Sequence, residues 1–279
     1  MKAYVLEWGT HRLELGRRTQ VMGILNVTPD SFSDGGKFYQ VEEAVARGVE
    51  MAAAGADIID IGGESTRPYS EAISPEAEMQ RVVPVIETLA KKSVPLSIDT
   101  TKAEVARQAL ECGAEMINDV SALSFDPEMA PLCARYGAAV ILMHMRGTPL
   151  TMQRQAAYGD LLTEVTGYLK NRIAYALRGG ISPSCLAIDP GIGFGKSVAD
   201  NLRLLNHLEV LEPLGRPVVV GTSRKSFIGK TLKCEVDERL EGTAATVALG
   251  IARGAHIVRV HDVASMRMVA DMSDAVVAG

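Results

Sequence analysis

The sequence predicts an α/β fold, a (β/α)₈ barrel of the TIM type with an N-terminal β-hairpin. Short apolar runs alternate along the chain with amphipathic helical patterns, eight of each, and this alternation is typical of parallel strands joined by helices. The apolar runs are continuous, as expected for strands that are buried on both faces. Polar residues gather where these runs end, which is the face where such barrels carry their functional groups.

The 279-residue chain is expected to form one domain, because barrels of this kind use about 250 residues. Residues 1–20 alternate loosely in polarity around Gly9-Thr10-His11 and predict the hairpin, and residues 21–279 predict the barrel. Strands are expected at residues 21–25, 57–61, 95–99, 115–118, 138–143, 186–189, 217–221 and 257–260. Helices are expected near residues 41–54, 75–91, 102–111, 127–135, 160–178, 199–208, 237–253 and 263–277.

The ends of the predicted helices agree with this division. Glycine follows several helical patterns, at Gly55, Gly113, Gly137 and Gly254, and glycine readily adopts the left-handed conformation that ends a helix. An open, doubly wound sheet shows the same alternation of strands and helices, so it is the alternative fold. The closed barrel is the simpler solution for eight strands buried on both faces.

Composition narrows the class of protein. The formal net charge is −5, so a general attraction to nucleic acid or to an anionic membrane is not expected. The four cysteines are widely spaced and form no Cys-x-x-Cys pair, which argues against a disulfide framework and a zinc ribbon. No apolar run approaches the length of a transmembrane helix, and the N-terminus lacks a signal-peptide pattern. We therefore expect a soluble, cytoplasmic protein.

Polar residues end three of the predicted strands, at Asp99, Asn118 and Asp189, and a closed barrel would bring them together. Carboxylate and amide groups in an apolar mouth need hydrogen-bond partners. A flat heterocycle rich in N–H donors fits them, because one carboxylate can accept two N–H bonds from an amidine-like edge. In the alternative interpretation, each aspartate caps the helix that follows it.

Basic residues predict an anion-binding part of the same site. Arg259 and His261 are two residues apart and share one face of an extended chain. Ser65, Thr66 and Arg67 add further donors, and arginine binds phosphate oxygens through two of its N–H groups. The alternative is that each arginine forms an ordinary surface ion pair.

The connection at residues 26–38 is longer than the roughly two to six residues usual between a strand and a helix. It is rich in polar residues and glycine, so we interpret it as a functional loop, with a surface turn as the alternative. Asn26 could be a ligand of Mg²⁺, which prefers few protein ligands together with phosphate oxygens. Lys225 and Ser226 open a helix, where anions bind favourably, although an exposed lysine is the alternative.

Five motifs taken together resemble the dihydropteroate synthase family. They are GILNVTPDSFSDGG at residues 23–36, GGESTRP at 62–68, IDPGIGFGK at 188–196, SRKSF at 223–227 and RVHDV at 259–263. The resemblance extends from about residue 20 to the end of the chain. It implies a (β/α)₈ fold and a transferase of folate biosynthesis, in which 4-aminobenzoate displaces pyrophosphate from 6-hydroxymethyl-7,8-dihydropterin pyrophosphate to give 7,8-dihydropteroate.

The resemblance also implies roles for individual residues. The pterin would be bound by Asp99, Asn118, Asp189 and Lys225. Pyrophosphate would be bound by Asn26, Thr66, Arg67, Arg259 and His261, with Mg²⁺ as the cofactor and Asn26 as its ligand. The 4-aminobenzoate would be bound by Phe32, Thr66, Pro68, Phe194 and Ser226. The catalytic roles fall to Asp99, Lys225, Arg259 and His261, and the family tends to form homodimers through barrel helices.

The implied reaction needs no strong base, because an aromatic amine is already nucleophilic. The leaving group sits on a methylene attached to an electron-rich pterin, so C–O cleavage can precede attack. The pterin and nearby carboxylates would stabilise the cation, and the anion site with Mg²⁺ would stabilise the departing pyrophosphate. The loops after the first two strands would close over the substrates, so we expect residues 31–36 to be poorly ordered without ligands and Asn26 to be well placed.

The chain departs from the family pattern after Pro68, where many members have glycine and this chain has Tyr69 and Ser70. A bulky residue there could narrow the aminobenzoate pocket, which leaves the reaction intact and puts sulfonamide susceptibility in question. Two other functions stay open. A corrinoid-type pterin-dependent methyltransferase would lack the loop with Phe32, and a non-catalytic pterin-binding barrel would be free to lose Arg67 or His261.

Overall fold

The computed structural model describes the chain except for residues 1, 29–36, 66–69, 71, 93 and 153–156, and it describes residues 37–40 by backbone alone. Eight parallel strands form one sheet in the order β8-β7-β6-β5-β4-β3-β10-β9. They are β3 (Gln20–Asn26), β4 (Ile58–Gly62), β5 (Leu96–Asp99), β6 (Met116–Asp119), β7 (Ala139–Met143), β8 (Leu186–Asp189), β9 (Val219–Val220) and β10 (Ile257–Val260). A parallel bridge between Ile188 and Val218 joins the two ends of this sheet. The predicted barrel is therefore confirmed over the open sheet.

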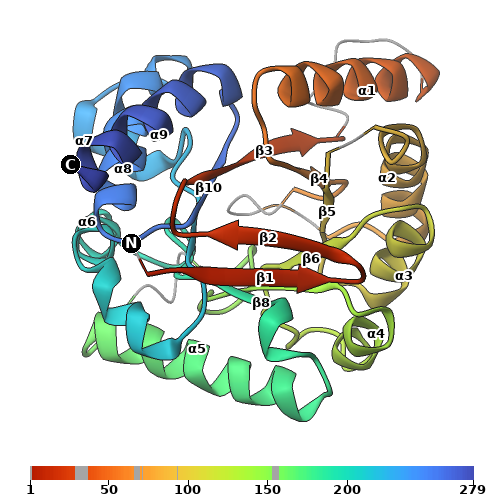
Figure 1. Cartoon of the computed structure of the whole chain (residues 1–279), viewed down its shortest axis with the longest axis horizontal. Coiled ribbons are helices and arrows are strands. Elements are labelled where there is room, and N and C mark those ends of the chain that lie inside the picture. The colour runs from red at the N-terminus through yellow and green to blue at the C-terminus, as the bar shows by residue number, and fades with distance from the viewer. Residues whose placement is uncertain (1, 29–36, 66–69, 71, 93, 153–156) are drawn as a thin grey trace.

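Helices surround the barrel on the outside (Figure 1). They are α1 (Lys37–Ala53), α2 (Pro75–Leu89), α3 (Ala103–Glu111), α4 (Met129–Tyr136), α5 (Leu161–Arg178), α6 (Val198–Asn206), α7 (Ser226–Leu232), α8 (Leu240–Ala252) and α9 (Val263–Ala278). Short 3₁₀ turns lie at η3 (Pro183–Cys185), η4 (Leu208–Leu214) and η5 (Val236–Glu238). Within the described part of the chain, no helix is both long and apolar enough to cross a membrane.

Two predicted elements differ from the structure in extent. The helix predicted at 237–253 is present as α8, with η5 covering its first residues, and α7 is a separate helix before them. Lys233 ends α7 in the left-handed conformation, with φ of +57°, and this reverses the chain before η5. The strand predicted at 217–221 is reduced to the two residues of β9. Pro217 has no N–H to donate to a neighbouring strand, which limits the pairing there.

The N-terminal hairpin closes the amino end of the barrel. Strands β1 (Tyr4–Trp8) and β2 (His11–Leu15) pair antiparallel, as predicted, and lie across the barrel opening (Figure 1). Leu6, Trp8 and Leu15 are buried in one cluster with side chains from inside the barrel, including Met22 and Ile58. The opposite, carboxyl end of the barrel is therefore the end left for a site.

Side-chain alternation decides which polar residues face the inside of the barrel. Interior residues packed with the hairpin include Ile58, Met116, Ala187 and Ile257. Residues two positions further along a strand face the same side. The interior layer nearer the carboxyl end is therefore polar and includes Asp60, Asn118, Asp189 and Arg259.

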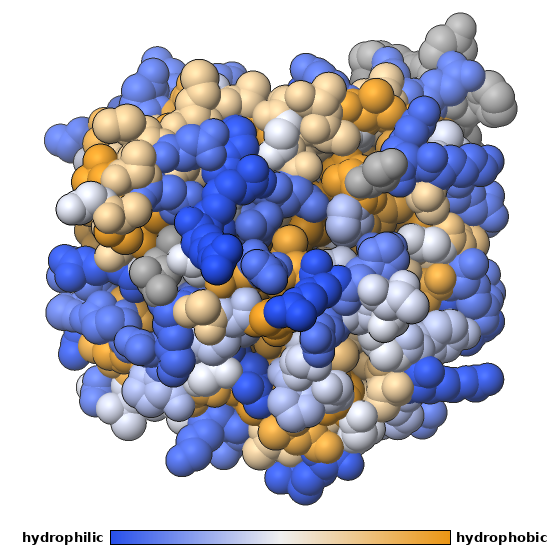
Figure 2. Space-filling view, viewed as in Figure 1, coloured by the Kyte–Doolittle hydropathy of each residue, from blue (hydrophilic) through white to orange (hydrophobic). Residues whose placement is uncertain are grey.

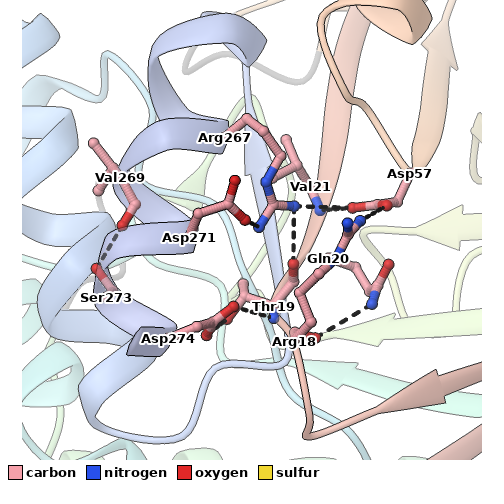
Figure 3. Close-up of polar contacts among 10 residues, drawn as sticks. All are labelled: Arg18, Thr19, Gln20, Val21, Asp57, Arg267, Val269, Asp271, Ser273 and Asp274. Carbon is pink, nitrogen blue, oxygen red and sulfur yellow. Dashed lines mark hydrogen bonds and ion pairs between the residues drawn. The ribbon is translucent and has the colours of Figure 1, made fainter. Parts of the chain in front are cut away.

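A polar network at the amino end ties α9 to the start of the barrel (Figure 3). Arg267 Nη1 lies 3.0 Å from the carbonyl oxygen of Thr19 and 3.2 Å from Asp57 Oδ2. Asp57 Oδ2 also accepts from the backbone N–H of Val21 at 2.8 Å. Asp274 accepts from the backbone N–H of Thr19 at 2.7 Å and from its hydroxyl at 2.6 Å. The last helix is thereby fixed to the first barrel strand.

Candidate active site

Parallel register aligns the tips of neighbouring strands. Asn26 pairs with Gly62, Gly62 with Asp99, and Asp99 with Asn118. A Cβ placed on Gly62 would lie 3.6 Å from the Cβ of Asp99 and 3.8 Å from Asn26 Oδ1. The structure therefore places the predicted metal ligand Asn26 and the predicted pterin residue Asp99 on either side of Gly62, with Asn118 on the next strand.

Arg259 links the strand tips through two carboxylates. Its Nε lies 2.6 Å from Asp60 Oδ2, and its Nη2 lies 2.7 Å from Asp99 Oδ2. Asn118 Nδ2 donates to the same oxygen of Asp60 at 2.9 Å. Sequence reasoning predicted Arg259, Asp99 and Asn118 and missed Asp60. The signal for Asp60 was available, since it is a carboxylate inside the apolar run of β4, two positions after the interior residue Ile58.

Two carboxylate oxygens in this network are left over. Asp60 and Asp99 are 0% and 7% exposed, and the Oδ1 atom of each is buried with no hydrogen-bond partner among the described residues. An unsatisfied buried acceptor costs free energy, so such atoms in a native site need an explanation. N–H donors of a bound ligand would satisfy both.

Burial changes the protonation of the carboxylates. It raises the pKa of Asp99 to about 7, because the lost hydration and the negative charge of Asp60 outweigh the stabilising charge of Arg259. Burial also raises the pKa of Asp189, against the opposing effect of Lys225. Asp189 Oδ1 accepts from the backbone N–H of Gly191 at 2.6 Å. Both carboxyl groups on the floor of the site therefore hold a proton more readily than exposed ones.

Lys225 brings a cation to the same floor. Its Nζ donates to the carbonyl of Ile192 and lies 4.7 Å from the ring centroid of Phe194. A Cβ placed on Gly221 would lie 3.7 Å from this Nζ and 3.7 Å from the Cβ of Arg259. Burial lowers the pKa of Lys225 to about 8, although the nearby charge of Asp189 opposes the change. The structure therefore brings the predicted residues Lys225, Phe194 and Arg259 together.

His261 and Ser226 lie at the rim. The Nδ1 of His261 is 2.9 Å from the hydroxyl oxygen of Ser223, which also accepts from the His261 backbone N–H at 3.1 Å. The carbonyl oxygen of His261 accepts from Arg47 Nη2 at 3.3 Å. Ser226 is the first residue of α7 and is exposed. The imidazole is thus held directly after the end of β10, two residues beyond Arg259.

A cavity of about 390 Å³ opens beside Asp99. Its lining comes from the segments that follow β4, β5, β6 and β7 and includes Val120, Phe125 and Leu150. Lys102 Nζ donates to the buried carboxylate of Glu78 at 2.5 Å and also to Glu64. Sequence reasoning assigned no role to Lys102 or Glu78, since their pairing depends on how α2 meets the start of α3. The cavity gives a ligand access to the carboxylate floor.

Several predicted residues lie outside the part of the chain that the structure describes. They are Phe32, Thr66, Arg67, Pro68 and Tyr69, together with the loop predicted around residues 31–36. Among the described residues, no group of three or more His, Cys, Asp or Glu side chains could hold a metal ion. The amide oxygen of Asn26 is the hard oxygen donor that Mg²⁺ prefers, and one such ligand suffices where phosphate oxygens supply the others.

The chain is similar to known proteins over almost its whole length. A family described as "Pterin binding enzyme" matches residues 22–261. Dihydropteroate synthase from Synechocystis sp. is 48% identical over 96% of this chain and 93% of its own length. The structure of Xanthomonas albilineans dihydropteroate synthase with 4-aminobenzoic acid is 46% identical, with a TM-score of 0.92 and 100% of both chains covered. Yersinia pestis dihydropteroate synthase with a sulfonamide drug complex is 41% identical, with a TM-score of 0.92 over 99% of this chain and 100% of that one.

Proposed function

This chain belongs to the dihydropteroate synthase family of pterin binding enzymes, and we propose that the residues at the carboxyl end of its barrel carry out the reaction of that family. The chain is a transferase of folate biosynthesis. It condenses 6-hydroxymethyl-7,8-dihydropterin pyrophosphate with 4-aminobenzoate, and it releases pyrophosphate and 7,8-dihydropteroate. The matches give no support to the methyltransferase or to the non-catalytic barrel, because the relatives named are dihydropteroate synthases.

The unsatisfied oxygens of Asp60 and Asp99 carry the proposal for the pterin site. A pterin presents N–H donors along one edge, and these donors would complete the hydrogen bonding of both carboxylates. Asn118 donates to Asp60 through Nδ2, so its amide oxygen points away from Asp60 and can accept from the ligand. Lys225 would donate to an acceptor of the pterin from the other side. Binding would then replace the water that each group loses on burial.

The positive groups around Arg259 would receive the leaving pyrophosphate. Arg259 and His261 lie on the last strand and its extension, and Arg67 and Thr66 are the further residues we propose for this role. Fixed positive charge at a buried site stabilises the negative charge that develops on a leaving group. Asn26 would hold Mg²⁺ together with pyrophosphate oxygens, and the bound ion would neutralise charge on the leaving group.

Attack by the amine of 4-aminobenzoate needs positioning more than proton removal. Phe194 lies against the Lys225 ammonium and is the described residue we propose for the aminobenzoate pocket, with Ser226 at its exposed rim. Holding the two reactants in one geometry replaces a collision in solution by a step within one complex. Asp99, whose pKa is raised to about 7, can exchange a proton as charge changes on the pterin.

The activity is tested directly. The purified chain with Mg²⁺ and both substrates is expected to form 7,8-dihydropteroate, measured by liquid chromatography, and an equal amount of pyrophosphate, measured by a coupled assay. Omission of 4-aminobenzoate is the control for simple hydrolysis. Release of pyrophosphate without dihydropteroate, or no release at all, would refute the assignment.

We also propose a homodimer in the cytoplasm. The outer face of α8 and α9 is apolar, with Leu249 57%, Met268 69%, Met272 66% and Val276 68% exposed, and Figure 2 shows apolar atoms over these helices. Residues 268, 272 and 276 form one stripe along α9, as expected of a helix that packs against a second copy. The cysteines are free, which suits a reducing compartment. Light scattering after chromatography tests the dimer, and Met272→Glu is expected to give monomers.

A further inference from the structure

A buried lysine that plays no part in the reaction above lies behind the site. Lys196 is 4% exposed, just before the start of α6. Its Nζ lies 2.9 Å from the carbonyl oxygen of Gly191, 3.1 Å from that of Phe194 and 2.9 Å from His144 Nδ1. An ammonium has three N–H donors and no acceptor, so these three acceptors match it in number. Burial lowers the pKa of Lys196 to about 7, so keeping a charged group here is costly.

The loop between β8 and α6 is wound around this ammonium. Gly191, Gly193 and Gly195 have φ of +69°, +87° and +61°, a region that favours glycine. A Cβ on Gly191 would lie 1.9 Å from the carbonyl oxygen of His144, so the loop packs directly on the end of β7. Asn201 of α6 accepts from the Gly193 backbone N–H at 2.6 Å. The loop is therefore held from inside by Lys196 and from outside by α6.

Two groups of this loop act on Lys225. The carbonyl of Ile192 accepts from its Nζ, and the ring of Phe194 lies 4.7 Å from the same atom. Both lie in the segment that Lys196 holds, which begins at Gly191 and ends at Phe194. Displacement of this segment would move the Lys225 ammonium and the Phe194 ring together. Asp99 and Asn118 lie on other strands. They would keep their contacts with Arg259 and Asp60, respectively.

We infer that Lys196 is a positioning residue of the reaction: it holds the segment 191–194 so that Ile192 and Phe194 keep the Lys225 ammonium and the aminobenzoate side of the site in place. Lys196 touches neither substrate and acts through the loop. This role rests on the function proposed above. It predicts a change in the use of 4-aminobenzoate that exceeds any change in the binding of the pterin.

Kinetics of a substituted enzyme test this role. Lys196→Met keeps the length of the side chain and removes its donors, so kcat/KM for 4-aminobenzoate is expected to fall about 100-fold, as for a displaced catalytic group. The KM for 4-aminobenzoate rises, and the KM for the pterin pyrophosphate rises to a smaller extent, because Lys225 is one of several pterin ligands proposed above. Lys196→Arg keeps the charge but places it on a planar group, so its kcat/KM for 4-aminobenzoate is expected to lie between those of the unsubstituted enzyme and Lys196→Met. Lys170→Met, at an exposed lysine of α5, is the matched control, and its kcat/KM for 4-aminobenzoate is expected to stay unchanged.

A merely structural role would give a different result. If Lys196→Met lowered kcat only in proportion to the folded fraction measured by circular dichroism, with both KM values unchanged, the inference would be wrong. Asn201→Ala releases the same loop from its outer side. Its effect on kcat/KM for 4-aminobenzoate is expected to be less than additive with that of Lys196→Met, and full additivity would contradict a shared action through the loop.

The unsubstituted enzyme offers a test that needs neither a variant nor activity. Because His144 Nδ1 accepts from Lys196, its ring proton must lie on Nε2, and burial lowers the pKa of His144 to about 2, so the ring stays neutral. Nitrogen NMR shifts of His144 are expected to show the Nε2–H tautomer in the free enzyme. A proton on Nδ1 would overturn the inference even if Lys196→Met failed to fold. This result is independent of whether dihydropteroate is formed.

Discussion

The two ends of the barrel carry polar networks built from the same residue types and satisfied to different degrees. At the amino end, both oxygens of Asp57 and both of Asp274 accept hydrogen bonds (Figure 3). At the carboxyl end, Asp60 and Asp99 each direct one oxygen to Arg259, and the other has no partner in the described part of the chain. The carboxylates at the amino end are therefore fully hydrogen-bonded, and a buried atom without a partner among the described residues there is a donor, Arg267 Nε. The unsatisfied acceptors at the carboxyl end lower stability and are available to a ligand.

Backbone strain follows the same division. Among the described residues, four have positive φ without being glycine: Ala122, Leu123 and Arg224 lie in loops at the carboxyl end, and Lys233 ends α7. The turn at residues 121–123 is held by Asp119, which accepts from the backbone N–H groups of Ser121 at 2.7 Å and Leu123 at 2.9 Å. Strained backbone that the surroundings hold in place is typical of functional sites. The carboxyl end is thus shaped for binding at some cost in stability.

The largest expected effect is the loss of Arg259. Arg259→Ala removes a fixed charge from the floor of the site, so kcat/KM is expected to fall by about 1,000-fold. Dihydropteroate formation measures this effect, and Arg253→Ala, at an exposed arginine after α8, is the control that leaves the rate unchanged. An unchanged rate for Arg259→Ala would remove this residue from the reaction.

The buried arginine of the amino end is expected to behave in the opposite way. Arg267 is 9% exposed and contacts Asp57 and the carbonyl of Thr19, so Arg267→Met leaves buried partners unpaired and lowers the free energy of unfolding by about 3 kcal/mol. Urea unfolding gives the stability, and kcat per folded molecule is expected to stay constant. A fall in kcat in fully folded Arg267→Met would show that the two ends are coupled.

Asp60 and Asp57 allow the sharpest comparison, because they lie three residues apart at opposite levels of the barrel. Asp60→Asn replaces an acceptor oxygen that we assign to the pterin and weakens the buried ion pair with Arg259, so pterin affinity is expected to fall about 10- to 100-fold and stability is expected to fall as well. Asp57→Asn is the matched control, which lowers the melting temperature and leaves pterin affinity unchanged. Calorimetric titration with a pterin distinguishes the two, and equal affinities for both variants would contradict the assignment.

The raised pKa of Asp99 predicts a pH effect of known sign. Since burial moves this pKa from 3.8 to about 7, the folded state holds its proton up to higher pH than the unfolded state. The contribution of Asp99 to stability therefore decreases as pH rises from about 4 to about 7 and is constant above that range. Asp99→Asn has no such proton to lose, so its stability is expected to fall less than that of the unsubstituted chain as pH rises through this range. Equal unfolding free energies at pH 4 are the internal control.

The smallest expected effect concerns strain. Ala122 has φ of +53°, and a residue other than glycine in the left-handed region loses about 1 kcal/mol. Ala122→Gly is therefore expected to raise the free energy of unfolding by about this amount, less the added flexibility of the unfolded chain. Thermal unfolding measures it. A destabilised Ala122→Gly would show that the methyl group, which is fully buried, contributes more by packing than the backbone costs.

Local sequence patterns predicted much of the candidate site. Asp99, Asn118 and Asp189 each stand at the end of an apolar run, and Lys225 opens a helix. The structure places all four around one floor. Asp60 was missed because it lies inside an apolar run, where the side that faces the barrel interior is unknown until the strands are paired. The Lys196 contact with His144 was missed because it spans 52 residues and depends on how two loops pack.

The sequence by itself determined the barrel and the end of the barrel at which its polar residues lie. Both follow from the periodicity of apolar residues and from the turn residues, which are local properties of the chain. Only the tertiary structure decided which carboxylates are satisfied. Asp57 meets Arg267 and Asp60 meets Arg259, partners separated by 210 and 199 residues. Such pairs form when the last strand closes on the first, and the register of that closure sets which oxygens remain for a ligand.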